Sequence, residues 1–448
     1  MPSSSAHTPA RPKVALTDMF RALQYKNYRL FFMGQGLSLI GTWMQQIAMS
    51  WLVYRMTESV VLLGVLGFAS QLPSFLLGPF AGVVSDRYNR HRVLLATQAL
   101  SMLQASVLTW LVMTGTVTVP WLLGLSAFLG FVNGFDVSAR QAFVVELIDK
   151  REDVSNAIAL NSSLFNVARL IGPSIAGVLI AAVGEEMCFL INALSYLAVI
   201  CSLLLMRVPP RALPKGKIRV WQSLQEGYRY VAGFPPIRSI LLLLAMISLF
   251  GMPFSVLMPV FARDILQGGA NTLGYLMGAS GIGALAGALY LARRTTVVGL
   301  GRVVVGAAML MGAALICFSF ARSLWVAMPF LLLAGLGMIV VMAANNTLLQ
   351  TIVDDDKRGR VMSFYAMAFF GMMPFGSLMA GLVADRVGVP FTLLGCGVLC
   401  LLSIIPFARQ LPAMRLLVRP IYERLGILPQ VAAGVQAATL MATPPEDQ

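Results

Sequence analysis

One arginine lies deep inside a long apolar segment, where charged side chains are rare. Arg169 stands about 14 residues into the segment 156–182, which corresponds to roughly 20 Å along a helix. In a bilayer, a charge at that depth costs several kcal/mol unless it faces a cavity or a partner. Arg169 is therefore a candidate to bind an anionic group of a ligand. The alternative is a structural arginine that ties helices together through carbonyl, Asn and Gln groups.

Other polar side chains in apolar segments extend this candidate site. Asn166 precedes Arg169 by three residues and shares its helix face, and Asn161 lies nearly in line with them. Such a polar stripe either lines a substrate cavity or bonds to adjacent helices. The remaining candidates for the cavity lining are Gln35, Trp43, Gln46 and Asn346.

A single acidic residue, Asp136, lies in or near the apolar segment 119–140. Carboxylates within membranes commonly take up and release protons. Asp136 is therefore a candidate for proton coupling. Arg140 follows it by one helical turn, so the alternative is a local ion pair.

The sequence gives no sign of enzymatic or metal chemistry. It has no phosphate-binding loop of the Gly-x4-Gly-Lys-Ser/Thr type, and its two histidines, His7 and His91, lie outside the apolar segments. We therefore expect no metal, no cofactor and no catalytic residues.

The composition identifies a membrane protein. Of the 448 residues, 58% are hydrophobic and 12% are charged, about half the charge that a water-facing surface requires. Apolar runs long enough to span a bilayer predict twelve transmembrane helices. They cover 30–54, 59–84, 93–114, 119–140, 156–182, 186–206, 238–262, 271–292, 302–320, 323–346, 361–384 and 389–408.

The basic residues predict the orientation of these helices. Of the 33 Lys and Arg residues, 28 lie in one set of alternate loops and four in the other, the remaining one being Arg169. The positive-inside rule then places both termini in the cytoplasm. We expect the membrane to be a bacterial inner membrane. The net charge of +14 is explained by these loops, so we expect no nucleic-acid partner.

A long basic loop divides the helices into two sets of six. We expect a cytoplasmic tail over 1–29, a six-helix bundle over 30–206, a linker over 207–237, a second bundle over 238–408 and a second tail over 409–448. The pair Gly172 and Gly177 recurs 204 residues later as Gly376 and Gly381. Similar halves are typical of transporters whose substrate site lies between them near the midplane.

The loop after the second span carries a recognisable pattern, Gly82-Val-Val-Ser-Asp86-Arg87-Tyr-Asn-Arg90-His-Arg92. It resembles the Gly-x3-Asp-Arg-x-Gly-Arg-Arg signature of the major facilitator superfamily, with Asn89 in place of the second Gly. The resemblance implies two six-helix bundles around a central cavity. It also implies that Gly82, Asp86, Arg87, Arg90 and Arg92 form a cytoplasmic latch between the halves.

Further segments resemble the drug:proton antiporter branch, which includes siderophore (enterobactin-type) exporters and macrolide efflux pumps. They are Ser38 to Trp43, Ala139 to Phe143, Asn156 to Asn161, Phe165 to Arg169 with Gly172-Pro173, and Arg358 to Met362. The resemblance implies that Gly172, Pro173 and Gly177 form a helix-bend motif that permits rocking. Relatives often carry an acid in the first span near Thr42, and this chain does not.

The expected function is secondary transport by a monomer in the bilayer, most simply export of a small amphipathic compound such as a siderophore, drug or metabolite in exchange for protons. The same architecture supports uptake or lysophospholipid flipping. A non-transporting scaffold or sensor is the rival from another class, but it would need neither a midplane arginine nor a latch.

Overall fold

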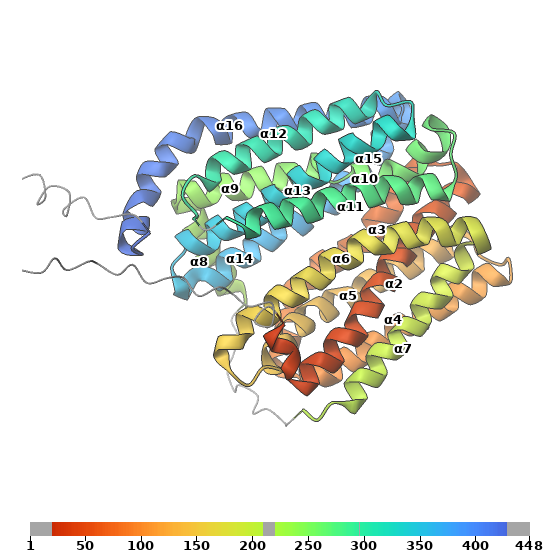
Figure 1. Ribbon diagram of the computed structural model, residues 1–448, viewed down its shortest axis with the longest axis horizontal. Coiled ribbons are helices and arrows are strands. Elements are labelled where there is room, and N and C mark those ends of the chain that lie inside the picture. The colour runs from red at the N-terminus through yellow and green to blue at the C-terminus, as the bar shows by residue number, and fades with distance from the viewer. Residues whose placement is uncertain (1–19, 209–219, 295, 428–448) are drawn as a thin grey trace, which may run out of the picture.

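The computed structural model describes residues 20–208, 220–294 and 296–427, and their regular secondary structure is entirely helical (Figure 1). The side chains of residues 79, 83, 85, 86, 220–224, 355 and 356 lie outside the described atoms. The predicted tails and linker fall largely or partly outside these ranges.

Two bundles make up the molecule. The first contains η1 (Arg21–Gln24), α2 (Lys26–Thr57), α3 (Val60–Arg87), α4 (Arg90–Met113), α5 (Val119–Glu146), α6 (Arg151–Val183) and α7 (Glu185–Leu205). After α8 (Val220–Gly233), the second contains α9 (Pro235–Met246), η2 (Ile247–Gly251), α10 (Phe254–Val260), η3 (Phe261–Ile265), α11 (Ala270–Ala292), α12 (Leu300–Ser319), α13 (Leu324–Ile352), α14 (Asp355–Phe370), α15 (Met373–Val387) and α16 (Val389–Arg424).

The predicted fold class, an all-α membrane protein, is confirmed. In the described chain, eleven helical stretches are long and apolar enough to cross a membrane. The one predicted span outside these eleven is the first, 30–54, which lies in α2, where Gln35, Gln45 and Gln46 lower the hydropathy. The seventh predicted span is built from α9, η2, α10 and η3, where two π-helical turns interrupt the α-helix. Helix α16 continues to Arg424, beyond the predicted end of its span.

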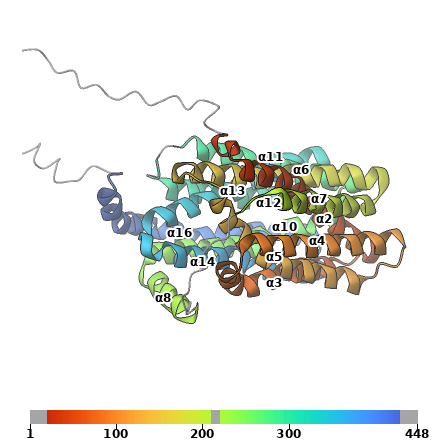
Figure 2. The ribbon, with the colours of Figure 1, turned by 90° about the horizontal axis from the view of Figure 1, so that it is seen from below.

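The two bundles meet closely at one end through glycines. A Cβ on Gly177 of α6 would lie 2.6 Å from the Cα of Gly274 on α11, and a Cβ on Gly381 of α15 would lie 2.9 Å from the Cα of Gly64 on α3. Only glycine permits such backbone contact. These contacts fix α6 against α11 and α3 against α15, and the helices can be followed in Figures 1 and 2.

At the other end the bundles separate. A Cβ on Gly78 or Gly82 of α3 would have no atom within 4 Å, and Ile158, Ser162 and Phe165 in the first half of α6 are exposed. Figure 1 shows the bundles diverging toward this end. The conformation is therefore closed at one end and open at the other.

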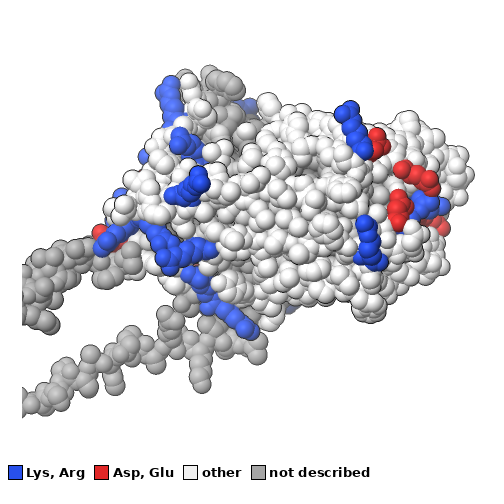
Figure 3. Space-filling view, turned by 90° about the horizontal axis from the view of Figure 1, so that it is seen from above, with Lys and Arg blue, Asp and Glu red and all other residues white. Residues whose placement is uncertain are grey.

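The two ends also differ in charge. Figure 3 shows Lys and Arg side chains gathered at one end of the visible face, whereas acidic and basic side chains are mixed at the other. We call the first the basic end, which carries the α3–α4 connection and the start of α14, and the second the opposite end. The open side of the molecule is the basic end.

A short segment anchors the start of α6 at the basic end. Arg21 of η1 forms a 2.8 Å ion pair with Asp153 of α6, and the Tyr25 hydroxyl donates to the same carboxylate at 2.7 Å. The hydrogen bond to Asp153 raises the pKa of Tyr25 above its ordinary value. The Tyr28 hydroxyl adds a bond to the Ala157 carbonyl at 2.9 Å. The start of α6 is thus fixed to the start of α2.

The glycine contact at the closed end predicts the effect of Gly177→Val. The added side chain would collide with the Gly274 backbone, and overpacking of this kind costs about 1 to 3 kcal/mol. We expect the population closed at the opposite end to fall roughly tenfold. Spin labels at the exposed positions Met56 and Asn271 would report a longer distance across this end.

Gly306→Val is the matched control, because this glycine is also in a spanning helix and a Cβ there meets no atom within 4 Å. It carries the same loss of glycine but no collision. Equal distance distributions in both variants would contradict the proposed role of the contact.

Candidate functional site

Helix α6 packs on both bundles, and its contacts define the direction of each face. Gly172 lies against Trp43 and the Ile40 carbonyl of α2, within the first bundle. Leu170 and Ser174 lie against Gly281 and Gly278 of α11, in the second bundle. One face of α6 therefore packs on α2 of the first bundle, and a second face packs on α11 of the second bundle.

The two remaining faces of α6 differ in polarity. One carries the exposed apolar side chains Val167, Ile171, Ile175 and Val178, spaced three and four residues apart as on a lipid-facing stripe. Arg169 belongs to the other, with Ser162 and Asn166 at the same spacing. Because this polar face is opposite the apolar stripe, it points toward the interior between α2 and α11.

The guanidinium of Arg169 lacks a full set of partners. Its Nη2 atom is buried, and within the described residues it has no hydrogen-bond partner. Leaving a buried charged donor unsatisfied costs more than the typical 1 to 3 kcal/mol for a neutral group. A carboxylate or phosphate could accept two parallel bonds from this planar group. This nitrogen thus leaves Arg169 with a hydrogen-bond donor for such a group.

An aromatic pair lies beside this arginine. The rings of Trp43 and Phe165 meet edge to face with centroids 5.7 Å apart. Phe165 is 43% exposed and precedes Arg169 by one turn, so both lie on adjoining parts of the same helix surface. Of the predicted residues, the structure thus brings together Arg169, Trp43 and Gly172. It adds Phe165, which was not predicted. A cation next to an apolar, aromatic surface suits an amphipathic ligand.

The other predicted residues of the first bundle take different places. The Asn166 amide donates to the Ser162 carbonyl at 2.9 Å within its own helix. Asn161 is half-buried and Gln46 is exposed. Gln35 is only 3% exposed, so it lies inside the packed bundle and does not present its amide to the polar face.

Asn346 lies in the second bundle, on α13. It accepts a hydrogen bond from Gln350 one turn later, and Tyr365 of α14 lies close by, donating to the Met342 carbonyl at 3.1 Å. These contacts form a separate polar group at the basic end of α13. In the described part of the chain, no hydrogen bond joins Asn346 to Arg169.

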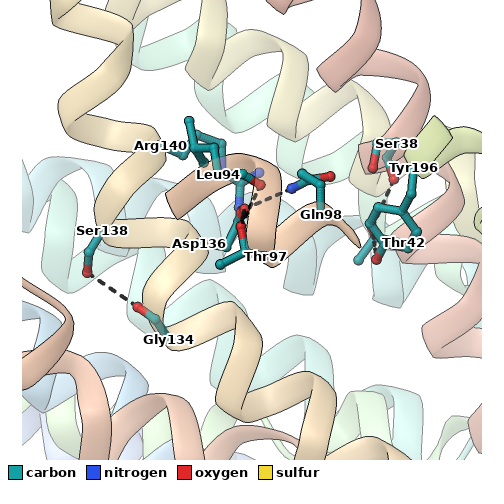
Figure 4. A network of polar contacts seen from close by, with 10 residues as sticks. All are labelled: Ser38, Thr42, Leu94, Thr97, Gln98, Gly134, Asp136, Ser138, Arg140 and Tyr196. Atoms are coloured by element: carbon teal, nitrogen blue, oxygen red, sulfur yellow. Dashed lines mark hydrogen bonds and ion pairs between the residues drawn. The ribbon is translucent and has the colours of Figure 1, made fainter. Parts of the chain in front are cut away.

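Asp136 is the centre of a buried polar network (Figure 4). Arg140 forms a 2.6 Å ion pair with it, and Thr97 and Gln98 of α4 donate to its Oδ1 at 2.9 and 2.8 Å. Asp136 is 3% exposed. The pairing with Arg140 that the sequence left open is therefore present within α5. The hydrogen bonds from Thr97 and Gln98 tie α5 to α4.

The described contact of the predicted latch residues lies within the first bundle. Arg90 pairs with Glu146 of α5 at 2.6 Å, within its own bundle, and Arg87 and Arg92 are exposed. The Asp86 side chain is outside the described atoms. The latch remains a prediction for a conformation closed at the basic end.

Polar contacts that the sequence analysis missed close the opposite end. Tyr54 of α2 donates a short hydrogen bond to Asp264 of η3, and Arg263 pairs with Glu58 at 2.7 Å. The Arg263 guanidinium also lies 5.7 Å from the centroid of the Tyr54 ring. All of these contacts cross from the first bundle to the second. The sequence did carry a signal for these contacts. Arg263 is one of the four basic residues in the less basic set of loops, and it directly precedes the acidic Asp264.

A second missed feature is an amide network in the core of the first bundle. The Gln45 amide donates to Gln104 Oε1 at 2.9 Å and accepts from Asn192 at 2.8 Å. Ser195 in turn donates to Asn192 Oδ1 at 3.2 Å. This network joins α2, α4 and α7. It accounts for the buried amide of Gln45 on α2.

The Asp136–Arg140 pair predicts a non-additive effect on stability. Removing one partner leaves the other as a buried, unpaired charge, which typically costs about 3 to 5 kcal/mol. We expect Asp136→Asn and Arg140→Gln each to lower the free energy of unfolding in mixed micelles by about this amount. The double variant should lose clearly less than the sum. Strict additivity would show that the pair makes no net contribution.

Comparisons with known proteins agree with this architecture. Solved structures of similar fold include a bacterial homologue of the lysosomal transporter Spinster in an inward-facing, occupied conformation, with a TM-score of 0.68, 14% identity, and 86% of this chain and 96% of that chain covered. A bacterial homologue of ferroportin gives a TM-score of 0.63 at 16% identity, covering 85% and 98% of the two chains.

Curated relatives are similar over most of their length. The staphyloferrin A transporter of Staphylococcus aureus is 26% identical over 85% of this chain and 96% of its own. The multidrug efflux pump Tap of Mycolicibacterium fortuitum is 25% identical over 78% and 87% of the two chains. The macrolide efflux protein A of Streptococcus pyogenes is 22% identical over 87% and 98%.

A family model described as transmembrane secretion effector matches residues 17–419, which is nearly the whole chain. This agreement confirms the resemblance to the drug-exporting branch of the superfamily. The chain belongs to the transmembrane secretion effector family of the major facilitator superfamily and is a secondary membrane transporter.

Proposed function

We propose that this transporter exports a small amphipathic compound that carries an anionic group, in exchange for protons. The single observation that carries the proposal is Arg169 on the polar face of α6, whose buried Nη2 atom has no hydrogen-bond partner among the described residues. The adjoining Trp43–Phe165 pair offers an apolar surface for the rest of the ligand. Relatives named for siderophore, drug and macrolide transport support export of such compounds.

The basic end is the cytoplasmic end in this proposal, and the membrane is a bacterial inner membrane. Support comes from the excess of Lys and Arg in the loops of that end, because such loops are retained in the cytoplasm. Substrate then enters from the cytoplasm while the basic end is open. The monomer suffices, since the polar face of α6 lies between bundles of one chain.

Export requires a second conformation, closed at the basic end and open at the opposite end. Opening there would break the contacts of Tyr54 with Asp264 and of Glu58 with Arg263. Closure of the basic end would bring Asp86, Arg87, Arg90 and Arg92 toward the start of α14, where a carboxylate is attracted to a helix N-terminus. Helix α6 would have to bend during this change. Gly172 allows close packing at that point, and Pro173 lacks a backbone N–H, so one helical hydrogen bond is absent there.

Proton coupling is assigned to Asp136 in this proposal. Protonation would remove the negative charge that holds Arg140 at 2.6 Å, and it would change the bonds from Thr97 and Gln98 of α4. A proton would therefore alter how α4 and α5 are held together. The first span offers no acid for this role, since Thr42 stands where relatives often carry one.

The site predicts that Arg169→Ala abolishes accumulation of the substrate. Inside-out membrane vesicles with wild type, Arg169→Ala or no transporter are incubated with a mixture of siderophores, drugs and metabolites under an inward-acid proton gradient. Mass spectrometry of the vesicle contents identifies what accumulates. We expect the wild-type vesicles to concentrate one compound. Vesicles with the alanine variant should accumulate at least tenfold less of it, because a loss of about 1.4 kcal/mol of binding free energy lowers affinity tenfold.

Arg169→Lys is the informative companion variant, since lysine keeps the charge but loses the planar, two-bonded geometry. We expect an affinity between those of wild type and alanine, with unchanged protein yield. Arg322→Ala, at an exposed position of the opposite end, serves as a control for loss of an arginine. Accumulation by wild type only in right-side-out vesicles would overturn export in favour of uptake.

Asp136→Asn separates coupling from folding. The variant keeps the shape of the side chain but cannot bind and release a proton. We expect it to exchange labelled substrate across vesicles without a gradient while losing accumulation driven by the proton gradient. Gradient-driven accumulation at the wild-type level would exclude Asp136 as the coupling carboxylate, and loss of both activities together with loss of the folded protein would leave only its structural role.

A further inference from the structure

Exposed apolar side chains on three neighbouring helices each lie on the same face as an exposed arginine at the basic end. On α16 the exposed side chains Val398, Leu402 and Ile405, spaced three and four residues apart, are followed at the same spacing by Arg409. Leu402 is 53% exposed. Arg409 therefore lies on the lipid side of α16, where the apolar stripe gives way to the headgroup region.

The same arrangement occurs on α12 and α9. On α12, exposed Met309 and Gly306 lead back to exposed Arg302 near the first residue of the helix. On α9, exposed Leu242 is one turn after exposed Arg238. Arg302 and Arg238 thus occupy positions on their helices equivalent to that of Arg409 on α16.

Contacts between these helices place the three arginines around one surface. Ser239 of α9 donates a short hydrogen bond to Gln410 of α16, and a Cβ on Gly301 of α12 would lie 2.5 Å from Leu411 Cδ1 of α16. Ser239, Gln410 and Gly301 each adjoin one of the arginines in sequence, and Leu411 lies two residues after Arg409. Since packed helices lie 8 to 10 Å apart, long arginine side chains from three neighbours can reach a common point.

This surface is positively charged without compensation. Within the described ranges, no ion pair joins Arg238, Arg302 or Arg409 to an acid, whereas Arg419 and Arg424 farther along α16 pair with Glu423 and Asp354. The N-termini of α9 and α12 add their partial positive charge at the same end. Figure 3 shows the gathering of basic side chains at this end.

We propose that Arg238, Arg302 and Arg409 form a binding site for the headgroup of an anionic phospholipid of the cytoplasmic leaflet. Guanidinium groups bind phosphate oxygens with paired hydrogen bonds, and the exposed stripes of α9, α12 and α16 accommodate the acyl chains. The site is on the outer surface of the second bundle, away from Arg169. It requires that the basic end is cytoplasmic, but it does not depend on what is transported.

Native mass spectrometry of the full-length protein tests this site. Protein is equilibrated in mixed micelles containing equal amounts of phosphatidylglycerol and phosphatidylcholine, and the lipid retained on each molecule is counted. We expect wild type to retain phosphatidylglycerol preferentially. The variant R238Q/R302Q/R409Q should lose this preference, with roughly a fivefold decrease in affinity for each arginine removed. The triple lysine variant should keep much of the preference.

R29Q/R207Q/R229Q is the matched control, because it removes three other exposed arginines at the basic end. It should retain phosphatidylglycerol as wild type does. Equal retention by wild type and R238Q/R302Q/R409Q would overturn the site, as would an equal loss in the control, which would indicate attraction by net charge alone. If the triple variant fails to fold, Arg302→Gln alone should show the roughly fivefold decrease.

Discussion

A guanidinium in a membrane-spanning helix persists only where the surrounding structure keeps hydrocarbon away from it. Arg169 is in this position because α6 is held on two sides, by Gly172 against α2 and by Gly177 against α11. The lipid side of the helix is left to Val167, Ile171 and Val178. A change in either glycine contact would rotate or displace α6 and move the charge toward lipid, where it costs several kcal/mol.

The same contacts set the conformation of the whole molecule. Glycine pairs and the polar contacts around Tyr54 and Arg263 hold the bundles together at the opposite end, while the described polar contacts at the basic end lie mostly within each bundle. Arg90 pairs with Glu146 of its own bundle, and Asp136 pairs with Arg140 of its own helix. Each bundle is therefore internally tied, so the interface between them is where movement costs least.

The polar residues of the first bundle serve two separate purposes. Gln45, Gln104 and Asn192 are hydrogen-bonded to one another in its core, where lipid offers no partner for a buried amide. Arg169 and Asn166 instead face the interior between bundles. A polar side chain in a spanning helix is thus not by itself evidence of a substrate site, because the bundle core requires hydrogen-bonded groups of its own.

The sequence alone determined the fold class, because apolar segments of spanning length and one-sided basic loops follow directly from the energetics of the bilayer. It also singled out Arg169 as a candidate, since a charged residue within a long apolar segment can be recognised without knowing which way its side chain points. Only the tertiary structure decided that Gln35 is packed inside the bundle, that Asp136 is bound by Arg140, Thr97 and Gln98, and that Phe165 joins Trp43. The physical reason is that the spacing of residues gives the face of a helix, whereas the neighbour on that face depends on how twelve helices pack.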